Sequence, residues 1–76
     1  MTINHAIGFV VANIRKEKGM SQLDLAFDMG TTRKYLSDIE NGKRNISLDV
    51  AWRLAEALGI SFTELIDCAV NEMEIR

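Results

Sequence analysis

The side chains of this chain that are best suited to chemistry lie in one short polar segment, residues 32–45. If a helix begins after Thr32, its outer face carries five side chains that can form hydrogen bonds: Arg33, Lys34, Ser37, Asp38 and Asn41. An arginine near the start of a helix in the DNA major groove can bind guanine O6 and N7 together, which discriminates between bases by about 1–3 kcal/mol. Arg33 is therefore the first candidate for base reading. Lys34 could also read a base, but less specifically, because it is a point charge.

The other polar residues of the segment suit either bases or phosphates. Asp38 lies one turn after Lys34 and could accept a hydrogen bond from cytosine N4, or it could orient Lys34. Ser37 could contact a base, or it could be small to leave room for the duplex. Phosphate oxygens are suitable partners for the hydroxyl groups and cations of the segment, which are Thr32, Tyr35, Lys43 and Arg44.

Two short helices hinged at Gly30 would position these side chains. Ser21 is a typical N-cap residue, and Thr32 can cap the second helix. Gly30 and Gly42 suit helix ends because glycine adopts the left-handed conformation there. The apolar residues at helical spacing, predicted to be buried, are Leu25, Ala26 and Met29, then Leu36 and Ile39. Such a helix pair can place its second helix in the major groove.

The remaining sequence also predicts helices and contains no alternating strand pattern. One helix is expected from about Asn4 to Lys18, and Gly8 inside it implies a close backbone contact. Another is expected from Ser47 to a stop at Gly59. A capping box at Ser61 and Glu64 begins the last helix. The residues predicted to be buried in the first and fourth helices are Ile7, Val10, Val11, Ile14, Leu48, Ala51, Leu54, Ala55 and Leu58. The sequence thus predicts an all-α, five-helix domain.

Composition limits the classes of function. The 76 residues suit one domain, and the net charge of −2 is unevenly spread. Residues 1–46 hold seven Lys and Arg against five Asp and Glu, whereas residues 47–76 hold two against six. Cys68 and His5 are too few and too far apart for a disulfide or a zinc site. We expect no cofactor, metal, catalysis or small-molecule ligand. The apolar segment 6–12 is too short to span a membrane, so we expect a cytoplasmic protein.

Three motifs in order resemble the Cro/C1-type (Xre) helix-turn-helix family: GMSQLDLA at 19–26, YLSDIENGKR at 35–44 and LAEALGIS at 54–61. The resemblance covers about residues 7–66 of a single domain spanning 1–76, and it leaves 67–76 as a C-terminal extension. Within the family, the chain is most similar to restriction–modification controller proteins and phage-type repressors. The resemblance implies a lambda-repressor-like fold, with a docking geometry on DNA that is itself a standard example of the motif.

The resemblance also implies roles for individual residues. Gln22 matches a position that contacts phosphate or supports a base contact. Arg15 and Glu40 match a partly buried ion pair. One departure from the family pattern is Ile46, where many relatives have proline before the cap. The positions that match DNA-facing ones in the recognition helix are Thr32, Arg33, Lys34, Tyr35, Ser37 and Asp38. Those that match the loop gripping the DNA backbone are Asn41, Lys43, Arg44 and Asn45.

Several apolar residues lie beside the predicted core stripes and suggest a dimer. A module this small reads only a few base pairs, so two copies on a pseudo-palindromic operator are expected. The predicted dimer contacts are Trp52, Phe62, Ile66, Val70 and Met73. The stripe after residue 65 could instead fold back on the monomer. We expect a transcriptional regulator that blocks or contacts RNA polymerase. The alternatives are the antitoxin of a toxin–antitoxin pair and a protein-interaction module that does not bind DNA.

Overall fold

The computed structural model describes residues 1–75, and all regular secondary structure in that range is helical. The five helices are α1 (Ile3–Glu17), α2 (Gln22–Met29), α3 (Arg33–Glu40), α4 (Leu48–Leu58) and α5 (Phe62–Ile75). This confirms the predicted all-α architecture. Arg76, the last residue of the predicted domain, lies outside the described residues.

Polar caps set the helix boundaries close to where the sequence predicts them. The Ser21 hydroxyl accepts a hydrogen bond from the Asp24 backbone N–H, and the Asp24 carboxylate accepts one from the Ser21 N–H, each at 3.0 Å. The bond donated by the Ser21 backbone N–H, with a smaller contribution from the Ser21 side chain, lowers the pKa of the Asp24 carboxyl, because it favours the ionised form. The hydroxyls that cap α3, α4 and α5 accept from the backbone N–H three residues on, and they belong to Thr32, Ser47 and Ser61.

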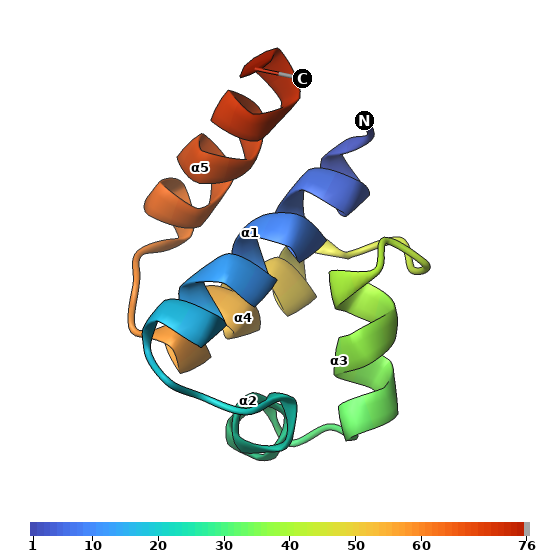
Figure 1. Ribbon diagram of the computed structural model, residues 1–76, viewed down its shortest axis with the longest axis vertical. Coiled ribbons are helices and arrows are strands. Elements are labelled where there is room, and N and C mark those ends of the chain that lie inside the picture. Colours follow the sequence, from blue (N-terminus) through green and yellow to red (C-terminus); the bar gives the residue numbers. More distant parts are fainter. Residues whose placement is uncertain (76) are drawn as a thin grey trace.

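The core lies between α1 and the helices α3, α4 and α5, and α2 completes it by packing against α3 and α4 (Figure 1). Its largest fully buried side chains are Val11, Leu25, Leu36, Ile39, Leu54, Leu58 and Leu65. All of the residues predicted to be buried in α2 and α3 are buried. Ile14 is only partly buried and packs at the edge of this core.

The prediction that Leu48 is buried is wrong, since 77% of this residue is exposed. Leu48 is the first residue of α4, and side chains in a helix lean toward its N-terminus. Its side chain therefore extends beyond the first turn of α4, where no other helix covers it. The rest of the predicted α4 stripe, from Ala51 to Leu58, is buried.

Helices α1 and α3 approach each other closely at Gly8, as the sequence predicts. A Cβ atom on Gly8 would overlap the backbone carbonyl oxygen of Ile39 and would lie 3.1 Å from that of Glu40. Only glycine therefore permits this spacing of the two helices. The contact fixes α3, and its polar outer face, relative to the core.

The last helix, α5, lies along α1, with both chain ends at the same end of the molecule (Figure 1). Leu65 and Ala69 are fully buried, and Ile66 packs against the core from its edge. Val70 and Met73 stay more than a third exposed. One face of α5 thus folds back on the monomer while a neighbouring face remains open. In residues 1–75, no helix combines the length and apolar character required to cross a membrane.

Candidate nucleic-acid interface

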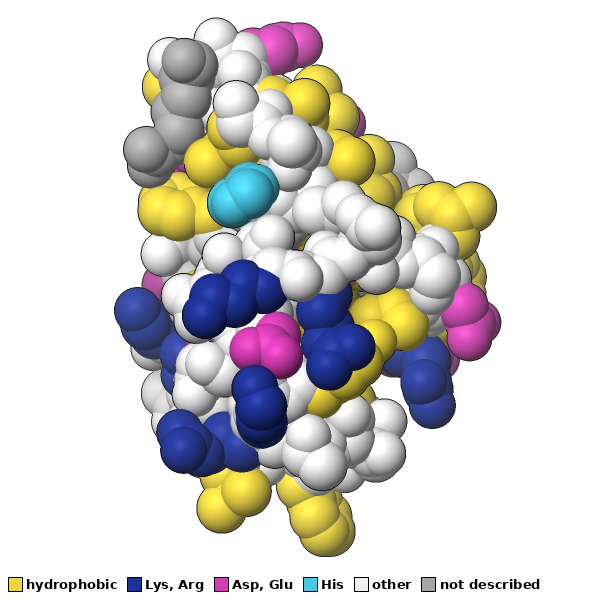
Figure 2. Space-filling model, turned by 90° about the vertical axis from the view of Figure 1, so that its right-hand side faces the viewer, with side chains coloured by type: hydrophobic (Ala, Val, Ile, Leu, Met, Phe, Trp, Pro, Cys, Tyr) yellow, Lys and Arg dark blue, Asp and Glu magenta, His cyan; other side chains and the backbone are white. Residues whose placement is uncertain are grey.

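The polar side of α3 faces outward, opposite the buried Leu36 and Ile39. Figure 2 views this side and shows Lys and Arg side chains gathered around an acidic one. Arg33 and Lys34 are both exposed, with 84% of the Lys34 side chain accessible. Ser37 and Asp38 are half-buried beside them. Both cations that the sequence predicts for base reading are thus exposed to solvent.

Asp38 lies between two cations at the centre of this side. Its carboxylate is 3.5 Å from Lys34 Nζ and 3.6 Å from Arg44 Nε. The Arg44 guanidinium also lies over the Tyr35 ring, 4.4 Å from its centroid. Because the Lys34 and Arg44 side chains are open to solvent, these ion pairs contribute only about 0–1 kcal/mol to stability. They orient the cations while leaving them able to exchange Asp38 for a phosphate or a base.

The ion pair implied for Arg15 and Glu40 is present and buried. Arg15 Nε lies 2.7 Å from Glu40 Oε2, and the two side chains are only 9% and 6% exposed. A second hydrogen bond of 3.1 Å joins Arg15 Nη2 to Glu40 Oε1. Arg15 Nη1 also donates to the Met20 carbonyl oxygen at 2.8 Å. This bidentate pair connects α1 to the end of α3 and to the start of the α2 segment.

Gln22 extends the same network toward α3, the predicted recognition helix. Its Nε2 donates to Glu40 Oε1 at 3.0 Å, so its Oε1 is left to accept from Arg33 Nη1 at 3.5 Å. In the protein without DNA, Gln22 therefore contacts Arg33, and its support of a base contact stays a prediction. A contact between Gln22 and a phosphate stays a prediction.

The loop after α3 exposes the other residues predicted to grip the DNA backbone. Lys43, Arg44 and Asn45 are exposed, and Asn41 Nδ2 donates to Ser37 Oγ at 3.4 Å. Sequence reasoning missed one residue here, Asn4 in the first turn of α1, whose side chain hydrogen-bonds this loop. The signal was absent because 41 residues separate Asn4 from Asn45.

The predicted dimer contacts lie on α4 and α5, where they form an apolar strip separate from the polar side of α3. The rings of Trp52 and Phe62 lie 5.8 Å apart between centroids and join α4 to α5. Leu48 lies one turn before Trp52 and extends the strip on α4. Along α5 the strip continues through residues at helical spacing, which are Ile66, Val70 and Met73. We name these six residues the α4–α5 strip.

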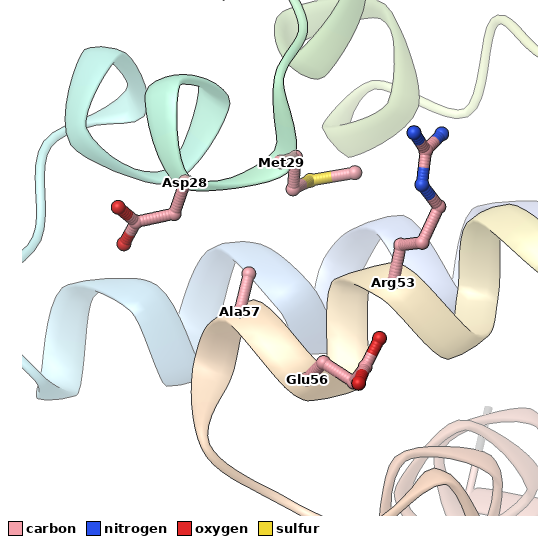
Figure 3. A pocket seen from close by; sticks show the side chains of 5 residues that line it. All are labelled: Asp28, Met29, Arg53, Glu56 and Ala57. Carbon is pink, nitrogen blue, oxygen red and sulfur yellow. The ribbon is translucent and has the colours of Figure 1, made fainter.

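A hollow of about 310 Å³ between α2 and α4 does not have the form of a ligand site. Figure 3 shows that the charged ends of Asp28, Arg53 and Glu56 point in different directions and do not converge. Among residues 1–75, no group of three or more His, Cys, Asp or Glu side chains could hold a metal ion. The cations gathered on the polar side of α3 and its loop make this side the candidate site.

A capped helix α2, a left-handed turn at Gly30 and an outward polar helix α3 define a helix-turn-helix protein. The chain matches the helix-turn-helix family over residues 11–65 and belongs to this Cro/C1-type family of transcriptional regulators.

Similar proteins include a control protein and two restriction–modification controller proteins. Control protein C.BamHI of Bacillus amyloliquefaciens is 46% identical over 61 residues, which are 79% of this chain and 75% of that protein. The controller protein C.AhdI from Aeromonas hydrophila is 41% identical in sequence. Its crystal structure superposes with a TM-score of 0.75, and the match covers 80% of this chain and 88% of that one. The structure of the controller protein C.Esp1396I, a tetramer in complex with its natural 35 base-pair operator, is 30% identical with a TM-score of 0.86, covering 95% of each chain.

Proposed function

We propose that the protein regulates transcription by binding a pseudo-palindromic operator in double-stranded DNA as a homodimer. The observation that carries this proposal is the outward presentation of Arg33 and Lys34 on α3, held by the buried Arg15–Glu40 pair. The likeness to C.Esp1396I, solved in complex with its operator, supports the same use of the fold. Such a regulator would act in the cytoplasm, with its DNA.

The residues of the site divide into two roles. Arg33 reads a base by a bidentate contact, assisted by Lys34, Ser37 and Asp38. The rest bind the phosphate backbone, which fixes the register of the protein on the duplex. This second group consists of Gln22, Thr32, Tyr35, Asn41, Lys43, Arg44 and Asn45.

Selection of bound duplexes from a random pool would define the operator and test the proposal. On that operator, Arg33→Ala should lower affinity by about 1–3 kcal/mol and leave affinity for random DNA nearly unchanged. Lys43→Ala should weaken binding to all sequences alike. It should also reduce by about one unit the slope of the logarithm of the binding constant against the logarithm of the salt concentration. Lys18→Ala, at the exposed C-terminal cap of α1 on the other side of the molecule from α3 (Figure 1), is the control, because it also removes one positive charge. Equal losses for Arg33→Ala and Lys43→Ala on operator and random DNA would contradict this division of roles.

The α4–α5 strip is the proposed dimer interface. It leaves large apolar side chains exposed next to a packed aromatic pair, and aromatic residues are enriched at protein interfaces. Pairing two copies would place their recognition helices about 34 Å apart, one turn of DNA. Phe62→Ser should shift the mass measured by light scattering from two chains to one. A mass of one chain for the unmutated protein, with and without operator, would refute the dimer.

Whether the dimer represses or activates transcription depends on whether it blocks RNA polymerase or contacts it. Transcription in vitro from a promoter that carries the selected operator separates the two, because a contact raises the transcript level and a block lowers it. A neighbouring methyltransferase or endonuclease gene would support a role as a restriction–modification controller. If the unmutated protein binds no duplex even at low salt, a role as a protein-interaction module would be favoured instead.

A further inference from the structure

Asn4 makes two hydrogen bonds from the first turn of α1 to the loop that follows α3. Its Oδ1 accepts from the Ile46 backbone N–H at 2.8 Å, and its Nδ2 donates to Asn45 Oδ1 at 3.0 Å. A backbone N–H can only donate and an amide NH₂ can only donate. The Ile46 N–H therefore sets which way the Asn4 amide points, and Asn4 in turn sets which way the Asn45 amide points.

This orientation decides what Asn45 presents to solvent. Because its oxygen is used by Asn4, its NH₂ group is the part of the amide directed elsewhere, and Asn45 is exposed. Within residues 1–75 this NH₂ has no hydrogen-bond partner. A phosphate oxygen accepts hydrogen bonds, so the NH₂ can bind it, whereas the reversed amide would present an oxygen and repel it.

The same contact anchors the far end of the loop. At the near end, the Lys43 backbone N–H donates to the Asp38 carbonyl oxygen of α3 at 2.9 Å. At the far end, Ile46 is held by Asn4 of α1. Lys43, Arg44 and Asn45 lie in the short span between these two anchors.

We infer that Asn4, which the sequence marked only as the start of a helix, is a positioning residue for DNA-backbone binding. It acts by fixing the donor orientation of Asn45 and the end of the 43–46 loop. The inference rests on the proposed function and deepens it, because it assigns part of phosphate recognition to α1, outside the helix-turn-helix.

Asn4→Asp tests the orientation step directly. An aspartate keeps the acceptor for the Ile46 N–H but cannot donate to Asn45, so the Asn45 amide should reverse and direct its oxygen toward the DNA. Asn13→Asp adds the same charge to an exposed position of α1 and is the matched control. Fluorescence anisotropy with a short mixed-sequence duplex at fixed salt measures the affinity.

We expect Asn4→Asp to lower duplex affinity about 3- to 10-fold more than Asn13→Asp does. In an Asn45→Ala background this excess should vanish, because the group that Asn4 orients is gone. Amide hydrogen exchange of Ile46 should stay slow in Asn4→Asp and should accelerate in Asn4→Ala. A general folding defect would lower affinity in both backgrounds and would also lower the thermal midpoint.

Two affinity results overturn the inference alone: equal losses for Asn4→Asp and Asn13→Asp, or an excess loss that persists in Asn45→Ala. Fast exchange of the Ile46 amide in the unmutated protein would also overturn it, by removing the anchor. Failure of the unmutated protein to bind any duplex would overturn the proposed function, and the inference with it.

Discussion

Replacement of Gly8 by alanine tests the α1–α3 contact that places the recognition helix. Inside a helix, alanine is favoured over glycine by about 1 kcal/mol, so helix propensity alone predicts a more stable protein. The structure predicts the opposite. The new Cβ would overlap the Ile39 carbonyl oxygen and crowd that of Glu40, and these backbone atoms can only move together with α3.

The magnitude follows from the two opposing effects. Overpacking of a core costs about 1–3 kcal/mol, and a clash with the backbone belongs at the upper end of that range. After subtraction of the propensity gain, Gly8→Ala should destabilise the protein by about 2 kcal/mol. For a domain of this size, that loss lowers the thermal midpoint by about 8–16 °C.

Circular dichroism at a fixed protein concentration measures the midpoint of each variant. Asn13→Ala, at an exposed position of the same helix, gains propensity without a clash and should raise the midpoint by a few degrees. The Gly8 variant should also lose operator affinity, because α3 must shift relative to α1. A midpoint for Gly8→Ala at or above that of the unmutated protein would refute the packing argument.

Three further substitutions test the network and the caps. Glu40→Gln leaves the buried Arg15 without its counter-charge and should lower the free energy of unfolding by about 3 kcal/mol in urea titrations, and a loss below about 1 kcal/mol would contradict the buried pair. Asp24→Asn should lower the thermal midpoint near neutral pH. Because the pKa of Asp24 is lowered in the folded state, its contribution is present above the ordinary carboxyl range and lost as pH falls below about 4, so the gap between the two proteins should close in acid. Ser47→Ala removes the α4 cap and should cost about 1 kcal/mol, measured by the same melts, whereas an unchanged midpoint would mean that water replaces the hydroxyl.

The helix boundaries could be predicted because their causes are local. Ser21, Thr32 and Ser47 each cap a helix by a bond to a residue only three positions away. The outward polar side of α3 also follows from local spacing, since Leu36 and Ile39, three residues apart, fix the face that packs on the core. Patterns that span three or four residues therefore predict most of the helices and their buried faces.

Contacts between distant segments could not be derived in this way. The Arg15–Glu40 pair spans 25 residues and was expected only through family resemblance. The Asn4 contacts with the loop span more than 40 residues and gave no periodic signal. Leu48 has the spacing of a core residue, but its position at the end of α4 leaves it uncovered, and spacing does not report where neighbouring helices end.

The aromatic pair of the α4–α5 strip has a practical consequence. Trp52 is the single tryptophan of the chain, and it is about half exposed beside Phe62. Its indole emission therefore comes from one known point on the proposed subunit boundary. Dilution of the protein while the emission wavelength is followed would report subunit exchange in real time, with no label attached.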